Sequence, residues 1–467
     1  MTMHTTLTPL FDAIEGLRRQ DFSRFHTPGH KGAPLGFLSA VTPWDFTEVR
    51  GADSLFEAEG PIAETERLYT ELYGTAGSFL SAGGSTLCIQ AMLRLVQPLG
   101  QKILIGRNAH GSAVSAMALL GLEPVWLCPR TGADLLPAPI TPAQAEEALR
   151  RNPDAAAVYV TSPDYFGKLT DIAGLAEVCH RHGVPLLVDN AHGAYLHFLK
   201  EGSRHPIQLG ADLCCDSAHK TLPVLTGGAY LHLGPSVQAD EAAVRNALAL
   251  FGSTSPSYLI LQSLDAANAV LADGFREKLD ICRWRLGMLC RELDTLRPGL
   301  ALPLIGAHRE PLKLTLDAAV LGLSGQQLAQ ALRERGVECE YAEPRYVVLM
   351  PSAESSAAEF ACLQTALHAI CGEAPVADVS VTTDDPAAFA ALAGVLEAQP
   401  RRFTIREAVL APQEMIPAAE AVGRICAAPA VSCPPAIPIV VSGETVPPEA
   451  LPLFARYGIE KAAVVKE

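Results

Sequence analysis

Two apolar runs that end in polar residues, VPLLVDNAHG (184–193) and ADLCCDSAHK (211–220), decide the fold class of this 467-residue chain. Neither run alternates apolar and polar residues, as a strand with one solvated face does. Unbroken apolar strands are expected where helices cover both faces of a mostly parallel sheet. The functional site of such a sheet lies beyond the carboxyl ends of its strands. Four polar residues fall at these ends: Asp189, His192, His219 and Lys220.

The chain on both sides of these runs continues the alternation of strands and helices. We predict further strands at 102–106, 155–163 and 227–234, and helices at 61–73, 112–121 and 171–183. A long helix over 259–296 is expected to lead to a second lobe, with strands at 312–319 and 346–352 and helices at 324–336 and 357–370. The predicted division is an N-terminal arm (1–60), a large cofactor-binding domain (61–296), a small α/β domain (297–374) and a C-terminal domain (375–467).

Composition limits the class of protein. With 49% hydrophobic and 19% charged residues the chain is typical of a globular protein with a large core. Its net charge of -15 argues against nucleic acid or an anionic membrane as partner. The twelve cysteines form no CxxC pair, no signal peptide is predicted from the first residues, and no apolar run reaches about 18 residues. We therefore expect a cytoplasmic protein with reduced thiols.

Lys220 and Asp189 together point to a cofactor. Desolvation at the end of a buried strand disfavours the charged form of a lysine, and the neutral amine can form a Schiff base with an aldehyde. Taken singly, most lysines in such a place are surface lysines, and the interpretation of Lys220 depends on its neighbours. Asp189 ends the strand 31 residues earlier, where a buried carboxylate needs a cationic partner. Pyridoxal 5'-phosphate supplies the aldehyde and a ring nitrogen that the carboxylate keeps protonated, so the pair predicts this cofactor.

The cofactor's phosphate and ring need further groups. The segment SAGGSTLCIQAML (81–93) places Gly84, Ser85 and Thr86 at the start of an apolar helix, and helix N-termini bind phosphate. Further hydroxyls come from Ser217 and from the cluster GSTSPS (252–257), which contains Ser253 and Thr254.

His110, after the strand 102–106, is a candidate for stacking on one face of the ring, and Ala191 is small enough to pack against the other. No metal site is predicted. His26 and His30 of HTPGH cannot share a helix face because a proline and a glycine lie between them, and no HExxH motif occurs.

Seven motifs, in order along nearly the whole chain, resemble the Orn/Lys/Arg decarboxylase family, in its short Gram-positive type. They are FHTPGHKG (25–32), DFTEVRGADSLFEAEGPI (45–62), SAGGST (81–86), TSPDYFG (161–167), VDNAHGAYLHF (188–198), DSAHKTL (216–222) and STSPSYLILQSLDAA (253–267). The resemblance implies the aspartate-aminotransferase fold (fold type I), an α/β protein with a mostly parallel seven-stranded sheet and a smaller α+β C-terminal domain.

For the site, the resemblance implies Lys220 as the Schiff-base lysine and Asp189 as the partner of the ring nitrogen. It implies Ser85, Thr86 and Ser217 as phosphate ligands, His110 as the stacking ring and His219 as a group near the reacting carbon. It also implies a homodimer or larger homo-oligomer with shared active sites, in which residues 253–257 reach the neighbouring subunit's phosphate. The chain departs from the family pattern at Asn190, where glutamate is usual, and in the tail motif SCPPAIPIVVSGE (432–444).

The expected reaction is α-decarboxylation of arginine, lysine or ornithine, which gives a polyamine-type amine and CO2. Glu444 is the candidate for holding the cationic end of this substrate. Two alternatives remain open on the residues alone. An aminotransferase would need an arginine for the α-carboxylate, such as Arg309 or Arg345, and a catalytically altered paralogue would fit the changed tail motif.

Overall fold

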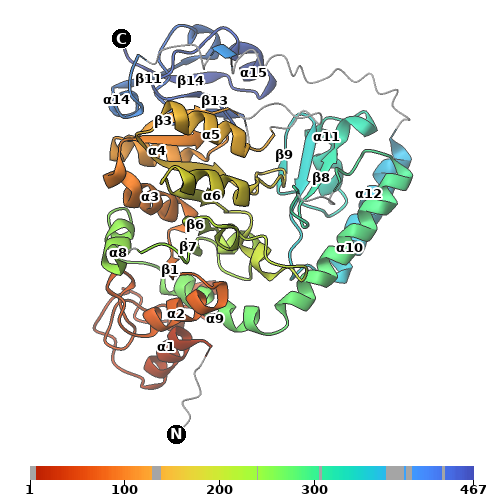
Figure 1. Ribbon diagram of the computed structural model, residues 1–467. Coiled ribbons are helices and arrows are strands. Elements are labelled where there is room, and N and C mark those ends of the chain that lie inside the picture. Colours follow the sequence, from red (N-terminus) through yellow and green to blue (C-terminus); the bar gives the residue numbers. More distant parts are fainter. Residues whose placement is uncertain are drawn as a thin grey trace. The chain divides into compact units, whose positions relative to one another are not determined.

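The computed structural model describes residues 7–128, 138–238, 240–303, 308–374, 394–395, 402–433 and 437–467, without the side chains of 432, 433 and 437. The chain forms two compact units (Figure 1). The first unit comprises Met1–Pro98 and Pro185–Glu277, and the second comprises Leu99–Val184 and Lys278–Glu467.

The main sheet has seven strands in the order β1-β7-β6-β5-β4-β2-β3. Parallel pairing joins β2 to β3, β2 to β4 and β5 to β6, whereas β7 runs antiparallel to both β6 and β1. Every residue of β5 and β6 is buried, as their unbroken apolar sequences predicted. The mostly parallel α/β fold is therefore confirmed. The strands are β1 Gly77–Ser81, β2 Lys102–Gly106, β3 Glu123–Leu127, β4 Ala155–Thr161, β5 Leu186–Asp189, β6 Leu213–Asp216 and β7 Ala229–Leu233.

The first unit contains four strands, β1, β5, β6 and β7, together with helices. Helix α2 begins at Pro61 and ends where Gly74 adopts a left-handed conformation (φ +62°), as the sequence predicted. The prediction of one helix over 259–296 is wrong, because Gly274 (φ +78°) separates two helices, α9 and α10. The helices of this unit are α1 Pro9–Arg19, α2 Pro61–Tyr73, α3 Gly84–Val96, α7 Ala218–Thr221, α8 Glu241–Ala249 and α9 Tyr258–Ala272, and α10 Phe275–Leu296 starts here.

The second unit contains strands β2, β3 and β4 with their helices, and two smaller cores. A three-stranded sheet in the order β8-β10-β9 lies beside α10, α11 and α12 (Figure 1). Leucines of these three helices pack with the sheet into one core. The C-terminal part builds another core from α15, β13 and β14. The elements are α4 Gly111–Leu120, α5 Pro142–Arg151, α6 Ile172–Arg181, β8 Leu314–Asp317, α11 Gly325–Arg333, β9 Tyr341–Ala342, β10 Tyr346–Leu349, α12 Ala357–Glu373, α14 Ile405–Leu410, β11 Gln413–Pro417, β12 Ala430–Cys433, β13 Ile437–Val441, α15 Ala450–Arg456 and β14 Lys461–Val465.

The predicted second lobe is thus present as strand, helix, strand and helix. The four-domain division stays a prediction, although the residues around 286–371 and 418–464 each have a core of their own. Pro434, Pro435 and Ala436 of the tail motif lie outside the described residues.

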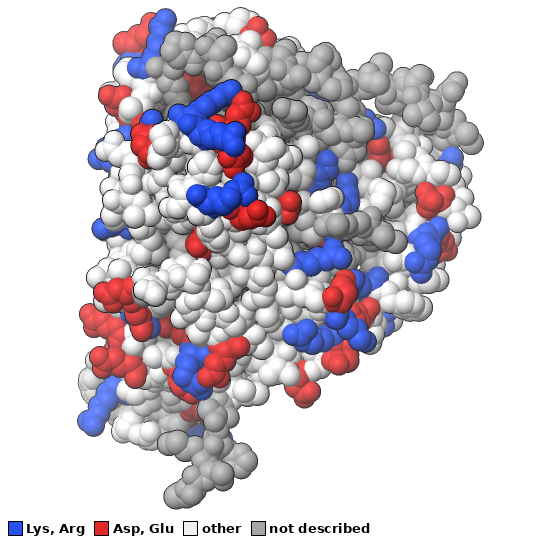
Figure 2. Space-filling model, in the orientation of Figure 1, with Lys and Arg blue, Asp and Glu red and all other residues white. Residues whose placement is uncertain are grey.

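The surface carries charges of both signs. On the face drawn in Figure 2, acidic and basic side chains of the described residues stand in small mixed groups. Within the described part of the chain, no helix combines the length and the apolar character that crossing a membrane requires.

Candidate active site

Lys220 lies one helical turn beyond the end of β6. Ser217 precedes the short helix α7, and Lys220 is its third residue. This turn leads the chain away from the buried strand, so Lys220 is exposed in the single chain, and the expectation of a buried lysine is wrong. Its Nζ lies 3.1 Å from Nε2 of His192, whose side chain is buried. The amine and this imidazole are therefore close enough to exchange a proton.

Asp189 ends β5 and is 2% exposed. Its Oδ1 accepts hydrogen bonds from the backbone N–H of Ala191 (3.1 Å) and from the thiol of Cys215 (3.6 Å). Cys215 is the residue beside Asp189 in the parallel register of β5 and β6. Burial and the nearby negative charge of Asp189 raise the pKa of Cys215 well above its ordinary value, so the thiol keeps its proton and remains a donor.

The predicted phosphate ligands Ser85 and Ser217 come together. The hydroxyl of Ser217 donates to that of Ser85 at 2.8 Å. Ser85 stands in the first turn of α3, whose leading N–H groups have no partner within the helix. At Gly84 (φ +66°) an added Cβ would meet no atom within 4 Å, so the space before this helix end is open.

These groups fit pyridoxal phosphate. A helix N-terminus and two hydroxyls suit its phosphate, the buried carboxylate of Asp189 suits its ring nitrogen, and Lys220 supplies the amine. Thr86, Ser253 and Thr254 are exposed, and the Ser253 hydroxyl accepts a hydrogen bond from the Ser255 backbone at 3.1 Å. Phosphate binding by these three residues stays a prediction.

His219 is held by the backbone of Gly228. Its Nδ1 lies 3.0 Å from the Gly228 carbonyl oxygen, which can only accept, so Nδ1 carries the hydrogen. In the neutral ring Nε2 then presents a lone pair and can take up a proton.

His110 belongs to the second unit and precedes helix α4. Its Nδ1 accepts from the backbone N–H of Ser112 at 3.2 Å and lies 2.8 Å from the Ser112 hydroxyl. The ring is exposed and oriented by this cap. Its predicted stacking on the cofactor is not tested by these contacts and stays a prediction.

Glu444 forms a buried ion pair with Arg107, one residue beyond β2. Arg107 Nη2 donates to Glu444 Oε2 at 2.8 Å, and Nη1 donates to Oε1. Glu444 Oε2 also accepts from the backbone N–H of Val441 at 2.8 Å. Burial alone would lower the pKa of Arg107, but Glu444 raises it, so the guanidinium stays charged. The substrate-binding role of Glu444 stays a prediction, and a substrate would compete there with Arg107.

The two arginines considered for an aminotransferase also have partners. Arg345 pairs with Asp317 at 2.7 Å, and Arg309 donates to the Phe166 carbonyl at 3.3 Å.

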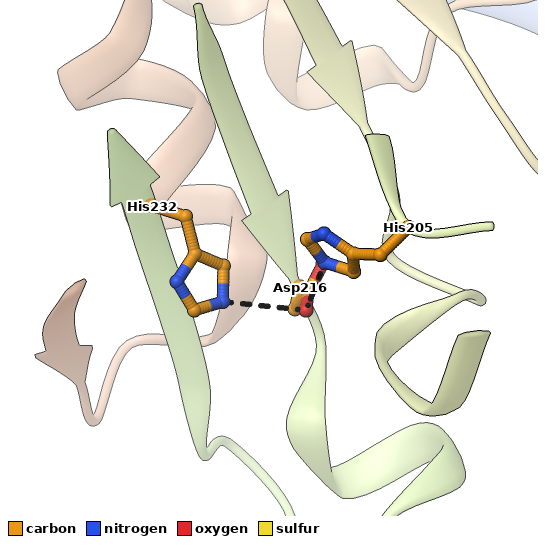
Figure 3. A group of neighbouring side chains, drawn as sticks. All are labelled: His205, Asp216 and His232. Atoms are coloured by element: carbon orange, nitrogen blue, oxygen red, sulfur yellow. Dashed lines mark hydrogen bonds and ion pairs between the residues drawn. The ribbon is translucent and has the colours of Figure 1, made fainter. Parts of the chain in front are cut away.

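A buried group of titratable side chains was missed by the sequence analysis. His205, Asp216 and His232 are wholly buried in the first unit, and both imidazole rings point toward the Asp216 carboxylate (Figure 3). Asp216 ends β6, His232 lies in β7, and His205 precedes the 3₁₀ helix Pro206–Leu209. Asp216 and His232 could have been noticed as polar residues within the apolar runs 211–216 and 229–233. The sequence around His205 offers no such signal.

Comparison with known proteins shows the family of the chain. The model of the Orn/Lys/Arg decarboxylase major domain matches residues 8–282. The uncharacterized protein YaaO of Bacillus subtilis is 32% identical, with 96% of this chain and 94% of that protein covered. An arginine decarboxylase of the same organism is 30% identical, with 96% and 93% covered. Among solved structures, the constitutive lysine decarboxylase of Escherichia coli shares the fold, with a TM-score of 0.75, 19% identity, and 99% of this chain and 82% of that chain covered.

The family match spans more than half of the chain and includes Asp189, His219 and Lys220. The chain therefore belongs to the Orn/Lys/Arg decarboxylase family of pyridoxal-phosphate-dependent amino-acid decarboxylases.

Proposed function

We propose that this enzyme removes the α-carboxylate of a basic amino acid, namely arginine, lysine or ornithine, and releases the corresponding amine and CO2. One observation carries the proposal: in a member of this family, Lys220, Asp189 and the Ser85–Ser217 pair all belong to the first unit and lie at or just beyond the ends of β5 and β6 or at the start of α3. The relatives named arginine decarboxylase, which align over most of their length, support arginine as the first substrate to test.

The cofactor, when bound, supplies a sink for the electron pair that remains when the bond from Cα to the carboxylate breaks. Asp189 would keep the ring nitrogen protonated, and Cys215 and the Ala191 N–H hold this carboxylate in place. Ser85, Ser217 and the start of α3 would anchor the phosphate. The enzyme's remaining task is to orient the substrate so that the carboxylate bond, rather than another bond at Cα, breaks.

Two residues can return the proton to Cα of the product. Lys220 can hand a proton on and recover it from His192, because Nζ and Nε2 lie 3.1 Å apart. His219 can carry a proton on Nε2 while its Nδ1–H donates to Gly228. Both positions follow β6 directly, at the carboxyl end of a central strand.

The proposal also includes that the enzyme forms a homodimer or larger homo-oligomer in the cytoplasm and that its amine product enters polyamine biosynthesis. In this assembly Ser253 and Thr254 would reach the phosphate of the neighbouring subunit. Their exposure in the single chain supports this role.

The test is incubation of the purified protein and pyridoxal phosphate with arginine, lysine and ornithine separately, with CO2, amine and keto acid measured. We expect CO2 and amine in equal amounts from at least one substrate and no keto acid. Lys220→Ala should abolish turnover, whereas Lys278→Ala, which removes an exposed pair with Glu354, should not. Keto acid as the main product, or full activity of Lys220→Ala, would contradict the proposal.

A further inference from the structure

The ends of β5 and β6 present different side chains to the two faces of the sheet. Successive residues of a strand point to opposite faces. Asp189 and Cys215 are paired in register and lie on one face, with the thiol donating to the carboxylate. The next residues, Asn190 and Asp216, lie on the other face, where Asn190 Nδ2 donates to Asp216 Oδ1 at 2.6 Å. This short hydrogen bond therefore joins the two strand ends on the sheet face opposite to Asp189 and Cys215.

Asp216 is fixed by further donors. His205 Nε2 lies 2.9 Å from Asp216 Oδ2, and His232 Nε2 lies 3.4 Å from the same oxygen (Figure 3). The Cys214 thiol donates to Oδ1 at 3.7 Å. Burial would raise the pKa of Asp216, but His205 and His232 lower it well below its ordinary value. Asn190 and Cys214 donate to Oδ1 and His205 donates to Oδ2, so the orientation of the carboxylate is determined.

The two histidines are themselves held by neighbours. His205 Nδ1 accepts from the Ile207 backbone N–H at 3.3 Å, so its hydrogen sits on Nε2 and is donated to Asp216. His232 Nδ1 lies 2.8 Å from the Ser78 hydroxyl of β1. Burial lowers the pKa of His232, which favours its neutral form. His205 therefore holds Asp216 by a hydrogen bond, and His232 lies near the same oxygen without forming one.

The two hydrogen-bonded residues stand next to the residues of the site. Asn190 lies between Asp189 and Ala191, and Asp216 lies directly before Ser217 and three residues before His219. Gly193 makes room for the amide, because an added Cβ there would collide with Asn190 Oδ1. If Asn190 moved relative to Asp216, Asp189 would therefore move relative to Ser217 and to the helical turn that carries Lys220.

We propose that Asp216 and Asn190 are positioning residues, which keep the segment Asp189–His192 in register with the segment Ser217–Lys220 for cofactor binding. The inference rests on the proposed cofactor site. It also gives Asn190, a departure from the family pattern, a physical reason: an amide donates to Asp216, whereas a carboxylate at 190 would place two negative charges side by side.

The test compares three isosteric variants, Asn190→Asp, Asp216→Asn and the exchange double variant, with Asp265→Asn as the control. Asp265 is also a wholly buried carboxylate of the first unit, but it accepts from Thr65 and from the Phe11 backbone rather than from β5 or β6. Two quantities are measured: the Kd for pyridoxal phosphate by titration, and the unfolding temperature of the cofactor-free protein.

We expect Asn190→Asp and Asp216→Asn each to raise the Kd about tenfold or more, because each variant loses one hydrogen bond to a charged group. The exchange variant restores an amide opposite a carboxylate and should recover part of this affinity. Asp265→Asn should lower the unfolding temperature without changing the Kd. If Asn190→Asp does not fold, Asn190→Ser removes the donor without adding a charge and is expected to raise the Kd similarly.

Three results would contradict the proposals, each in a different part. If the wild-type protein does not bind pyridoxal phosphate, the proposed cofactor site itself is wrong. If the wild type binds and the Asn190 and Asp216 variants bind equally well, these residues do not position the site. Stoichiometric metal that is lost with Asp216→Asn would show that His205, Asp216 and His232 are metal ligands instead of a hydrogen-bonded anchor.

Discussion

Glu444→Ala is expected to destabilise the second unit strongly, because it leaves Arg107 buried without its counter-ion. The two side chains are 6% and 7% exposed, and they share two hydrogen bonds. Removing one partner of such a buried pair costs about 3–5 kcal/mol. Glu444→Gln retains an acceptor for the guanidinium, so its expected loss is smaller, about 1–3 kcal/mol.

Denaturant unfolding followed by tryptophan fluorescence measures this loss. Trp126 reports on the pair, because the Arg107 guanidinium lies 4.9 Å from its ring centroid. Midpoints are compared rather than extrapolated free energies, since a chain with several cores need not unfold in one step. The control is Glu373→Gln, which breaks an exposed pair with Arg335 and should cost less than about 1 kcal/mol.

Equal midpoints for Glu444→Ala and Glu373→Gln would refute the reasoning from the buried pair. The same variants also separate the two roles considered for Glu444. If its carboxylate also holds the substrate's cationic end, Glu444→Gln raises KM for that substrate, whereas KM stays at the wild-type value and only the unfolding midpoint falls if Glu444 pairs with Arg107 alone.

Three further outcomes follow from individual residues. Burial lowers the pKa of His197 to about 4 in the folded protein, so the unfolded chain takes up a proton first as the pH falls. The contribution of the neutral His197 ring to stability is complete above about pH 6.5. Toward pH 4 this contribution falls by at most about 1.4 kcal/mol per pH unit. His197→Phe should flatten this slope in unfolding midpoints between pH 7 and 4, and an unchanged slope contradicts the cause. Gly84→Ala should weaken cofactor binding about tenfold or more, because its Cβ would enter the open space that we predict holds the phosphate. Gly74→Ala, also at a left-handed glycine with open space around it, should lower stability alone. Asp189→Asn should abolish turnover and Cys215→Ala should reduce it only partly, since the Ala191 N–H still holds the carboxylate; equal losses would contradict this order of importance.

Strand patterns and special residues predicted most of the fold. The segment Lys102–Gly106 forms the strand with the predicted bounds, and Gly74 ends its helix as expected. Strands β1 and β3 were missed because GSFLS begins with a glycine and EPVWL includes a proline, and both residue types are depleted in strands. The break at Gly274 was missed because apolar residues continue on both sides of it.

For the site, the sequence predicted the kinds of residues better than the positions of single side chains. Ser85 at the start of a helix and Ser217 after a strand were both predicted as phosphate ligands, and their hydroxyls meet in the folded chain. The sequence did not indicate that Lys220 leaves the buried layer on a one-turn helix, since DSAHKTL carries no signal that distinguishes that turn from the end of a strand. The pairing of Glu444 with Arg107 joins residues 337 positions apart, and only the folded chain shows it.

The central claim is that Lys220 binds the aldehyde of pyridoxal phosphate. Borohydride reduction of the cofactor-loaded protein makes this bond permanent, and mass spectrometry of the digest locates the modified residue. The account predicts one pyridoxyl group per chain, on the peptide that contains Lys220, and none in Lys220→Ala. A modification at any other lysine, or its absence from the loaded wild type, would contradict the account.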